Sequence, residues 1–301
     1  MKKQIIVTTL VVLGLVGLAQ AQTQAQQGEL HGAVGATYDT KYVWRGYTVF
    51  GQKSGIHPFV DLDLFGTGFG LNVTGNRANS SGYEESERWD YTLTYAGALE
   101  VEQTYETRYM VGYRYFNYPD LSWSKSANLA AGEIGSVDLQ EVFAGVGFPR
   151  LLGVPGLVPG YAIVKGWPSN SDTVVGCANP NGGTYSGWAH IFMLDYALPL
   201  QNVLPDVPEQ ILNFHLETVY NAGVDPRPLG GYTSHDWTHV MASVSTDFDL
   251  GNNVILTPAL SYQITMEDDG RELMPGYPTS TRGVSPDHDI VWASATLKYK
   301  F

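Results

Sequence analysis

Ser186 and His190 are the pair of side chains whose types could support nucleophilic catalysis, in which a histidine activates a hydroxyl group. Apolar residues at alternate positions from Trp188 to Tyr196 predict a β-strand, with Ser186 and His190 on its outward face. Two residues four positions apart on a strand are separated by roughly 13 Å, which is too far for a hydrogen bond. The sequence therefore predicts no catalytic pair here.

The composition gives no support for a metal site, a cofactor or a nucleic-acid partner. Cys177 is the only cysteine among 301 residues, which excludes an intramolecular disulfide and a cysteine-based zinc site. Lys and Arg number 17 against 30 Asp and Glu, a formal net charge of -13, which argues against a nucleic-acid partner. We therefore expect no catalytic residue, no metal, no cofactor and no nucleic acid.

Charged side chains recur at alternate positions of several segments and could line an aqueous passage. In the segment 88–99, Arg88 and Asp90 stand on one face, while Trp89 and Tyr91 stand on the other. Elsewhere the same alternation brings the total to eight acidic and eight basic residues on polar faces, so an interior lined by them would be close to neutral. The predicted lumen-lining residues are Asp39, Lys41, Arg45, Asp61, Asp63, Arg88, Asp90, Glu106, Arg108, Arg114, Glu141, Lys165, Asp195, Glu217, Lys298 and Lys300.

Period-2 alternation of apolar and polar residues predicts about twelve β-strands, several of them long enough to cross a bilayer at a tilt. Long links alternate with links that are mostly short. The exceptions are two Pro-rich links, at 148–160 and 199–209, which stand where short ones are expected. Long loops at one end, short turns at the other and an even strand count are typical of outer-membrane barrels. The predicted fold is all-β: a transmembrane antiparallel β-barrel of the outer-membrane type with about 12 strands.

The two faces of such a barrel follow from the solvent on each side. In hydrocarbon every backbone polar group needs an internal partner, so the sheet must close, and its apolar face must point to the lipid. The first and last strands should pair, with residues 30–36 alongside 297–301. The side chains expected to face lipid include Val34, Tyr38, Leu62, Leu93, Tyr109, Leu260 and Leu297.

The alternation also suggests a register for the first hairpin. A turn near residues 47–51 would set Lys41 opposite Phe59 or Asp61, as a charge pair inside the lumen. Arg45 would then end the first strand near the extracellular mouth.

The N-terminus has the pattern of a secretory signal. Lys2 and Lys3 precede an apolar run, and Ala19-Gln20-Ala21 is a small-x-small cleavage site, so residues 1–21 are predicted to be a cleaved signal peptide. Residues 22–29 would form a short N-terminal segment and residues 30–301 a single barrel. The expected location is the outer membrane of a Gram-negative cell.

Two stretches resemble known outer-membrane proteins. Tyr42-Val43-Trp44-Arg45-Gly46, followed by Gly70-Leu71-Asn72-Val73, resembles the opening of the TorF-like outer-membrane porin family, and the similarity covers about residues 30–76. This resemblance implies a small porin and transfers no substrate site. The last strand, which alternates to a terminal Phe301 with Tyr299 before it, resembles the signal that the barrel assembly machinery recognises.

Three functions fit these observations. The first is a porin-like channel for passive diffusion of small hydrophilic solutes, because twelve strands should leave a narrow or side-chain-gated pore. The second is a closed barrel that anchors surface loops for adhesion or partner binding. The third is an outer-membrane lipid-modifying enzyme. The expected partners are outer-membrane lipid and lipopolysaccharide, the barrel assembly machinery and small polar solutes.

Overall fold

The computed structural model describes residues 28–84, 87–119, 138–169, 187–204, 207–226, 233–266 and 289–301. The predicted signal peptide, Cys177 and Ser186 lie outside these ranges. Within the ranges, no helix is long and apolar enough to cross a membrane.

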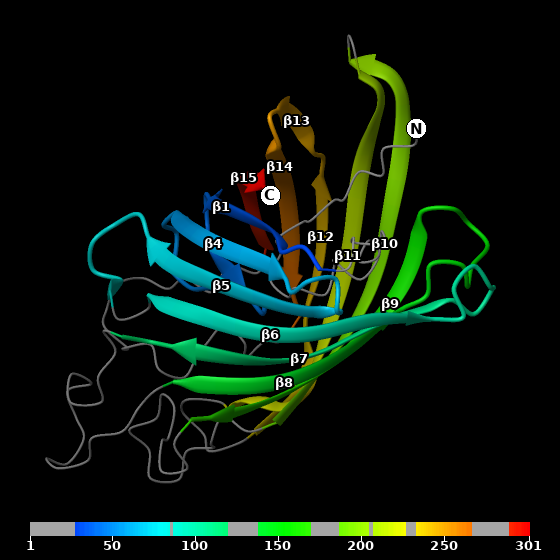
Figure 1. Cartoon of the computed structure of the whole chain (residues 1–301). Coiled ribbons are helices and arrows are strands. Elements are labelled where there is room, and N and C mark those ends of the chain that lie inside the picture. Colours follow the sequence, from blue (N-terminus) through cyan, green and yellow to red (C-terminus); the bar gives the residue numbers. More distant parts are fainter. Residues whose placement is uncertain are drawn as a thin grey trace, which may run out of the picture.

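Twelve strands form a closed antiparallel barrel, as the sequence predicts (Figure 1). Neighbours in the sequence pair with each other, and the pairing of β1 with β15 closes the ring. The strands are β1 (His31–Asp39), β4 (Gly55–Asp63), β5 (Phe69–Ala78), β6 (Arg88–Leu99), β7 (Thr107–Asn117), β8 (Leu139–Gly147), β9 (Leu157–Pro168), β10 (Gly187–Leu204), β11 (Val207–Pro226), β12 (Thr233–Ser245), β14 (Val254–Thr265) and β15 (Asp289–Lys300). A short strand, β13 (Phe248–Gly251), follows β12 and also pairs with β14.

The first and last strands pair as predicted. Ala36 lies opposite Leu297 and Ala33 opposite Lys300. The main chains of Gly32 and Phe301 exchange two hydrogen bonds of 3.0 Å. Because the terminal residue itself extends the ladder, both ends of the barrel sequence lie at the same rim, which we call the short-turn end; the opposite rim is the long-link end.

Deletion of Phe301 is expected to lower the amount of folded barrel in the outer membrane. The deletion removes both hydrogen bonds to Gly32 and the aromatic end of the closing strand. The amount is measured by the heat-modifiable gel mobility of membrane fractions. Phe301→Tyr keeps the ring and the main chain and should behave like the unaltered protein. Normal levels of the deletion variant would contradict a role for this residue in assembly.

Alternate residues of each strand face inward and outward. On β15, Val291 and Leu297 are exposed, whereas Ile290 and Thr296 are buried. The side chains predicted to face lipid lie on the outer side: Val34, Tyr38, Leu93, Leu260 and Leu297 are exposed, and Leu62 and Tyr109 are half-exposed. The apolar face therefore points outward, as lipid requires.

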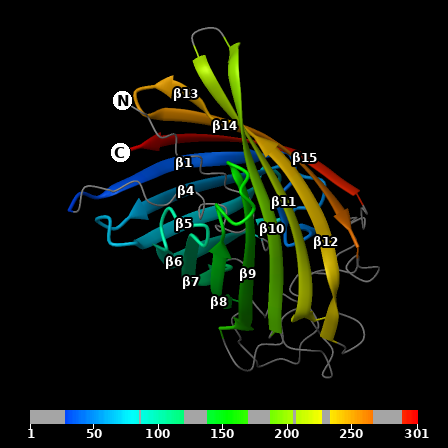
Figure 2. The same ribbon diagram turned by 90° about the vertical axis from the view of Figure 1, so that its right-hand side faces the viewer.

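One hairpin projects past the short-turn end (Figures 1 and 2). The Pro-rich link predicted at 199–209 instead extends β10 and β11, with Pro199 opposite Ile211. The neighbouring strands stop earlier, since β9 pairs with β10 only as far as Tyr196 and β12 pairs with β11 only from Asn213 onward. Pro199 lacks an N–H group, but beyond the end of β9 it has an edge position, where this loss is tolerated.

The predicted register of the first hairpin is wrong. Asp39 lies opposite Gly55, and Asp61 lies opposite Ala33, so Lys41 does not pair with Asp61. The reason is that β1 ends at Asp39, and residues 40–54 form a long connection that includes the short strands β2 (Val43–Trp44) and β3 (Tyr47–Thr48). We call residues 40–54 the inner loop.

Candidate functional site

The inner loop folds into the barrel as a small hairpin. β2 and β3 pair through Val43 with Thr48 and Trp44 with Tyr47. The two residues between them, Arg45 and Gly46, have φ angles of 49° and 91°, the left-handed values of a type I′ turn. The flanking apolar side chains are almost fully buried: Tyr42, Val43, Trp44, Val49 and Phe50.

The tip of the inner loop spans the interior. Arg45 forms an ion pair with Glu141 on β8. On the far side, Gln263 of β14 donates a hydrogen bond of 2.8 Å to the carbonyl oxygen of Gly46. Gly46 also packs against His239 of β12 so closely that a Cβ atom would lie 2.9 Å from the Nδ1 atom. In the strand order β8 and β14 are separated by four strands, so the tip bridges distant parts of the wall.

Glu141 is held by two arginines. Its side chain is 0% exposed and accepts hydrogen bonds from Arg45 and, at 3.1 Å, from Nη1 of Arg114. Arg114 and Glu141 are cross-strand neighbours on β7 and β8, and Nε of Arg114 donates to Thr92 at 3.0 Å. Both predicted residues therefore lie inside the barrel. Arg45 joins them from the inner loop and not from the end of β1 at the mouth, which corrects the sequence interpretation.

Arg88 occupies an aromatic enclosure beside this cluster. Its Nε lies 2.9 Å from Asp90, and Nη2 donates to the hydroxyl group of Tyr42 at 2.9 Å. The guanidinium carbon lies 4.3 Å from the ring centre of Trp44 and 4.7 Å from that of Phe116. A planar cation between aromatic faces gains electrostatic stabilisation from both. Arg88 thus anchors the inner loop to β6 and β7.

Two histidine clusters inside the barrel were missed in the sequence. His57 of β4 lies 3.3 Å from Asp39, and its ring centre lies 4.5 Å from that of Tyr42 of the inner loop, with the two rings tilted. On β11 and β12, the carboxylate of Glu217 lies 3.8 Å from His215 and 3.4 Å from His239. His57 and His215 are buried at inward positions of their strands, so alternation was the available signal for these two residues.

The remaining predicted residues lie at several depths. Lys298 is buried 3.7 Å from Asp247, and Asp195 contacts His215 at 2.7 Å. On β4 and β15, Asp61, Asp63 and Lys300 stand in the half of the barrel near the short-turn end.

Lys165 faces the outside, contrary to the sequence prediction. Its Nζ atom lies 5.5 Å from the ring centre of Trp188, which is exposed. Its two cross-strand neighbours, Val142 and Trp188, are both outward residues, whereas the adjacent Val164 is buried. The error arises because β9 carries apolar residues on both faces, so its polar side chain does not mark the inner one.

Glu106 and Arg108 meet at the short-turn rim. Glu106 accepts hydrogen bonds from Arg150 at 2.9 Å, Arg108 at 3.1 Å and the main chain of Glu102 at 3.1 Å. Burial raises the pKa of Glu106, but these bonds to its charged form outweigh burial and hold the pKa below its ordinary value of 4.5.

Glu106→Gln is therefore expected to lower the thermal stability at pH 7 and to have less effect in acid. A carboxyl group with a depressed pKa stabilises the fold above its ordinary pKa, and this contribution is lost as the pH falls through the folded-state value. Melting temperatures of both proteins in detergent, taken from neutral pH to below 4.5, test this. A difference that grows in acid would contradict the assignment.

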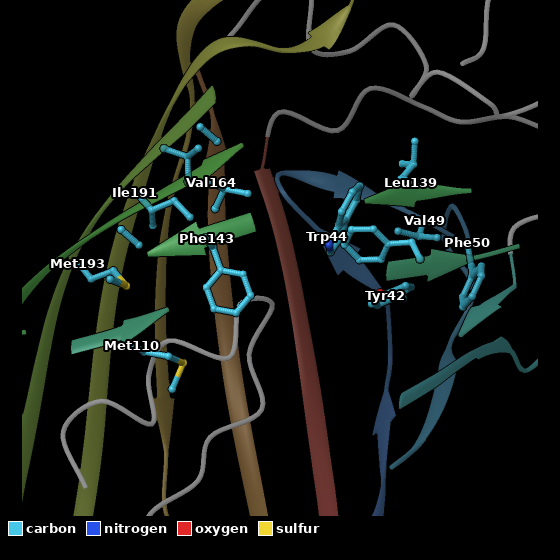
Figure 3. Close-up of a cluster of buried hydrophobic side chains, with 14 residues drawn as sticks. Tyr42, Trp44, Val49, Phe50, Met110, Leu139, Phe143, Val164, Ile191 and Met193 are labelled. Carbon is cyan, nitrogen blue, oxygen red and sulfur yellow. The ribbon is translucent and has the colours of Figure 1, made fainter. Parts of the chain in front are cut away.

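An apolar inner wall runs across β8, β9 and β10. The inward residues Phe143, Val164, Ala162, Ile191 and Met193 are buried, although the sequence predicts a polar inner face throughout (Figure 3). Gly112 on β7 makes room for this wall, because a Cβ atom there would lie 2.3 Å from the ring of Phe143. The wall begins beside the arginines, since the guanidinium carbon of Arg114 lies 5.4 Å from the ring centre of Phe143.

His190 lies on the outer face, as predicted. Its Nδ1 shares a hydrogen bond of 2.7 Å with the hydroxyl group of Tyr161, and its ring lies 6.3 Å from that of Tyr220. It belongs to an aromatic group on the outside of β9, β10 and β11.

The fold is similar to that of solved outer-membrane channels. The NanC porin matches with a TM-score of 0.50 and 9% sequence identity, over 90% of this chain and 100% of that one. The CymD monoaromatic hydrocarbon channel has a TM-score of 0.39 at 10% identity, covering 97% and 94% of the chains. The outer membrane channel DcaP of Acinetobacter baumannii has a TM-score of 0.33 at 9% identity, covering 91% of this chain and 96% of that one. No family sequence model and no curated protein matches the chain. The chain therefore has the fold of outer-membrane β-barrel proteins.

Proposed function

We propose that this protein is an outer-membrane porin-like channel, through which small solutes diffuse passively along a narrow, charge-lined interior. The observation that carries the proposal is the inner loop, which reaches across the barrel and is held there by polar contacts at its tip: Arg45 to Glu141, and Gly46 to Gln263. Arg45, Arg114 and Glu141 are charged groups on the inner side of the barrel, as a charge-lined interior requires. The barrel fold shared with NanC is consistent with this role.

The orientation and partners follow as parts of the same proposal. Long loops face the cell exterior in outer-membrane barrels, so the short-turn end and both termini would face the periplasm. The proposal also includes export through a cleaved signal peptide and contact of the loops with lipopolysaccharide. Insertion by the barrel assembly machinery would depend on Phe301. Tyr42 to Gly46, which carry the resemblance to TorF-like porins, form the inner-loop turn, and we propose membership of that family.

A closed barrel is the second candidate, and one observation favours it. Inward side chains of the described residues are largely buried: Glu141, Asn221 and Ala162 are fully buried, and Arg88 is only 2% exposed. Side chains therefore fill much of the interior around the inner loop. A channel with an interior filled in this way would have a low conductance or would open and close.

Planar-bilayer recording on the refolded protein decides between the two. Discrete current steps that scale with KCl concentration would support the channel. Absence of current from protein that shows the heat-modifiable mobility of a folded barrel would favour the closed barrel. Protein unfolded by heat before addition serves as the control for membrane leakage.

A further inference from the structure

We infer that the turns of the short-turn end are embedded in the adjoining leaflet of the membrane, and that Arg150 there binds the phosphate group of a phospholipid. Two observations carry this inference. Large apolar side chains are exposed on turns around most of this rim, and the exposed guanidinium group of Arg150 stands among them. The inference concerns the outside of the barrel and does not depend on whether the interior conducts.

The turn between β8 and β9, residues 148–156, carries exposed apolar side chains. Leu151, Leu152 and Val154 are 48%, 51% and 44% exposed. Turns in water are built mainly from glycine, proline and polar residues, and an exposed apolar patch marks contact with a membrane or with another protein. Arg150 is the only charged residue of this turn. The turn therefore suits an apolar environment that offers one polar contact.

Exposed apolar side chains recur on other turns of this end. The turn between β6 and β7 carries Val101 and Tyr105, and Tyr105 is 74% exposed. Phe65 is exposed in the turn after β4, and Leu250 is exposed on β13, before the turn into β14. These turns are distributed from β9 through β4 to β14, which is most of the ring (Figure 1). A lipid leaflet surrounds the barrel and contacts all of them, whereas a protein bound at one side contacts only some.

The apolar surface of the turns continues the lipid-facing surface of the strands. Tyr95 and Leu99 are exposed on the outer face of β6, and Val101 is exposed two residues beyond its end. β8 has only 9 residues, the lower limit for a tilted strand that crosses the hydrocarbon. The turn that follows β8 therefore begins where the hydrocarbon ends, and its side chains lie at the boundary with the lipid headgroups.

Arg150 provides the polar contact at this boundary. Its Nε atom donates a hydrogen bond of 2.9 Å to Glu106, which joins the β8–β9 turn to the β6–β7 turn. The Arg150 side chain is 51% exposed, and no described residue accepts a hydrogen bond from its Nη groups. A guanidinium group binds phosphate oxygens through paired N–H groups, while its apolar stem lies along apolar surface. Arg150 is thus placed to hold a headgroup phosphate.

The surrounding groups favour the phosphate of a lipid over a phosphate ion from solution. Glu100 and Glu102 are exposed on the β6–β7 turn, so this rim does not attract anions in general. A phosphate ion gains only the contact with Arg150. A phospholipid gains this contact and also buries its acyl chains against Leu151 and Leu152. The apolar turn therefore supplies part of the binding free energy that a free ion lacks.

The first experiment measures the surroundings of the β8–β9 turn. A fluorophore is attached to Leu152→Cys in a Cys177→Ser background, which removes the only native cysteine. In phosphatidylglycerol-containing vesicles, we expect strong quenching by lipids that are spin-labelled near the headgroup. We also expect iodide to quench this label several-fold less than a label on Gln201→Cys, an exposed position of the projecting β10–β11 hairpin.

Two results of this experiment would overturn the embedding. One is equal access of iodide to both labels. The other is a label that is protected in native outer membranes but open to iodide in the vesicles, because a protein would then cover the turn.

The second experiment measures the phosphate contact. Native mass spectrometry of the detergent-solubilised barrel with dioleoylphosphatidylglycerol gives the dissociation constant of the bound lipid. Arg150→Gln should raise this constant about tenfold, the effect of losing one charge-assisted contact. Arg77→Gln is the matched control and should leave it unchanged. Arg77 is also exposed and donates from Nε to one carboxylate, Glu87, at 2.9 Å, but it lies toward the long-link end.

Further outcomes separate the lipid from a free ion and from the proposed function. Inorganic phosphate should not displace the lipid, and displacement would overturn the lipid assignment. Arg150→Lys keeps the charge without the paired N–H groups and should give an intermediate constant. An unchanged constant in Arg150→Gln that shows the heat-modifiable mobility of a folded barrel would overturn the phosphate contact. Absence of current in planar bilayers would overturn the channel and leave this inference standing.

Discussion

Replacing residues 41–53 by a short Gly/Ser turn is expected to raise the single-channel conductance several-fold, or to create conductance where the unaltered protein has none. The replacement removes Tyr42, Trp44 and Phe50 from the interior together with Arg45, whose contact with Glu141 bridges the barrel. With these side chains gone, the interior is bounded by the strand walls alone. Planar-bilayer recording in KCl measures the change.

The geometry of the first hairpin makes this replacement feasible. Asp39 at the end of β1 lies directly opposite Gly55 at the start of β4. Opposed residues of antiparallel strands are about 5 Å apart at their Cα atoms, so a tight turn can join them without disturbing either strand. The barrel should therefore still close through β1 and β15.

A second deletion controls for the shortening of the chain. Replacing residues 200–209 by a tight turn removes the end of the β10–β11 hairpin, which projects beyond the neighbouring strands. This variant should keep the original conductance, because the removed segment lies outside the barrel wall. Equal conductance of all three proteins would show that the inner loop does not obstruct the pathway.

The strands and their closure could be predicted because each depends on a local pattern. Alternation fixes which face of a strand is apolar, and lipid fixes where that face points, so Val34, Leu93 and Leu297 were placed correctly. In lipid the backbone polar groups of the first and last strands need hydrogen-bond partners, so these two strands must pair with each other. Neither step requires knowledge of long-range contacts.

The inner loop could not be predicted because it continues the same alternation. Tyr42 and Trp44 are apolar while Lys41 and Arg45 are polar, as in a membrane strand. The chain leaves the barrel wall after Asp39, and the positive φ angles at Arg45 and Gly46 reverse it. Arg-Gly lacks the Asn or Asp that commonly marks such a turn, so no local turn signal distinguishes this segment from a membrane strand.

The interior histidines and the apolar wall were missed for different reasons. A register shift between Val219 and Tyr220 on β11 lets both Thr238 and His239 of β12 face inward, which breaks the parity of that strand. On β8, β9 and β10 both faces are largely apolar, so alternation does not identify the inner one. What turns inward there is decided by packing against residues from other strands.

Arg88→Met is expected to lower the free energy of unfolding by about 3–5 kcal/mol, the usual loss when one partner of a buried ion pair is removed. Arg88 is 2% exposed, and the carboxylate of Asp90, 14% exposed, would remain largely shielded from water without its cation. The hydrogen bond to Tyr42 and the stacking on Trp44 would be lost as well, so the inner loop would lose its anchor to β6. Urea unfolding in detergent, followed by tryptophan fluorescence, measures the change.

Arg77→Met provides the matched comparison on the neighbouring strand. Arg77 also has a carboxylate partner, Glu87 at 2.9 Å, but its side chain is 64% exposed. The carboxylate of Glu87 is 13% exposed, close to the 14% of Asp90, so the two pairs differ mainly in the exposure of the arginine. A pair that is open to water on one side contributes about 0–1 kcal/mol, because water solvates the exposed guanidinium group. The two substitutions remove the same atoms, so the difference between their effects isolates the buried environment of Arg88. Equal losses would mean that the aromatic enclosure and the buried pair with Asp90 do not stabilise the barrel, and that the inner loop is held by its contacts with Glu141 and Gln263 instead.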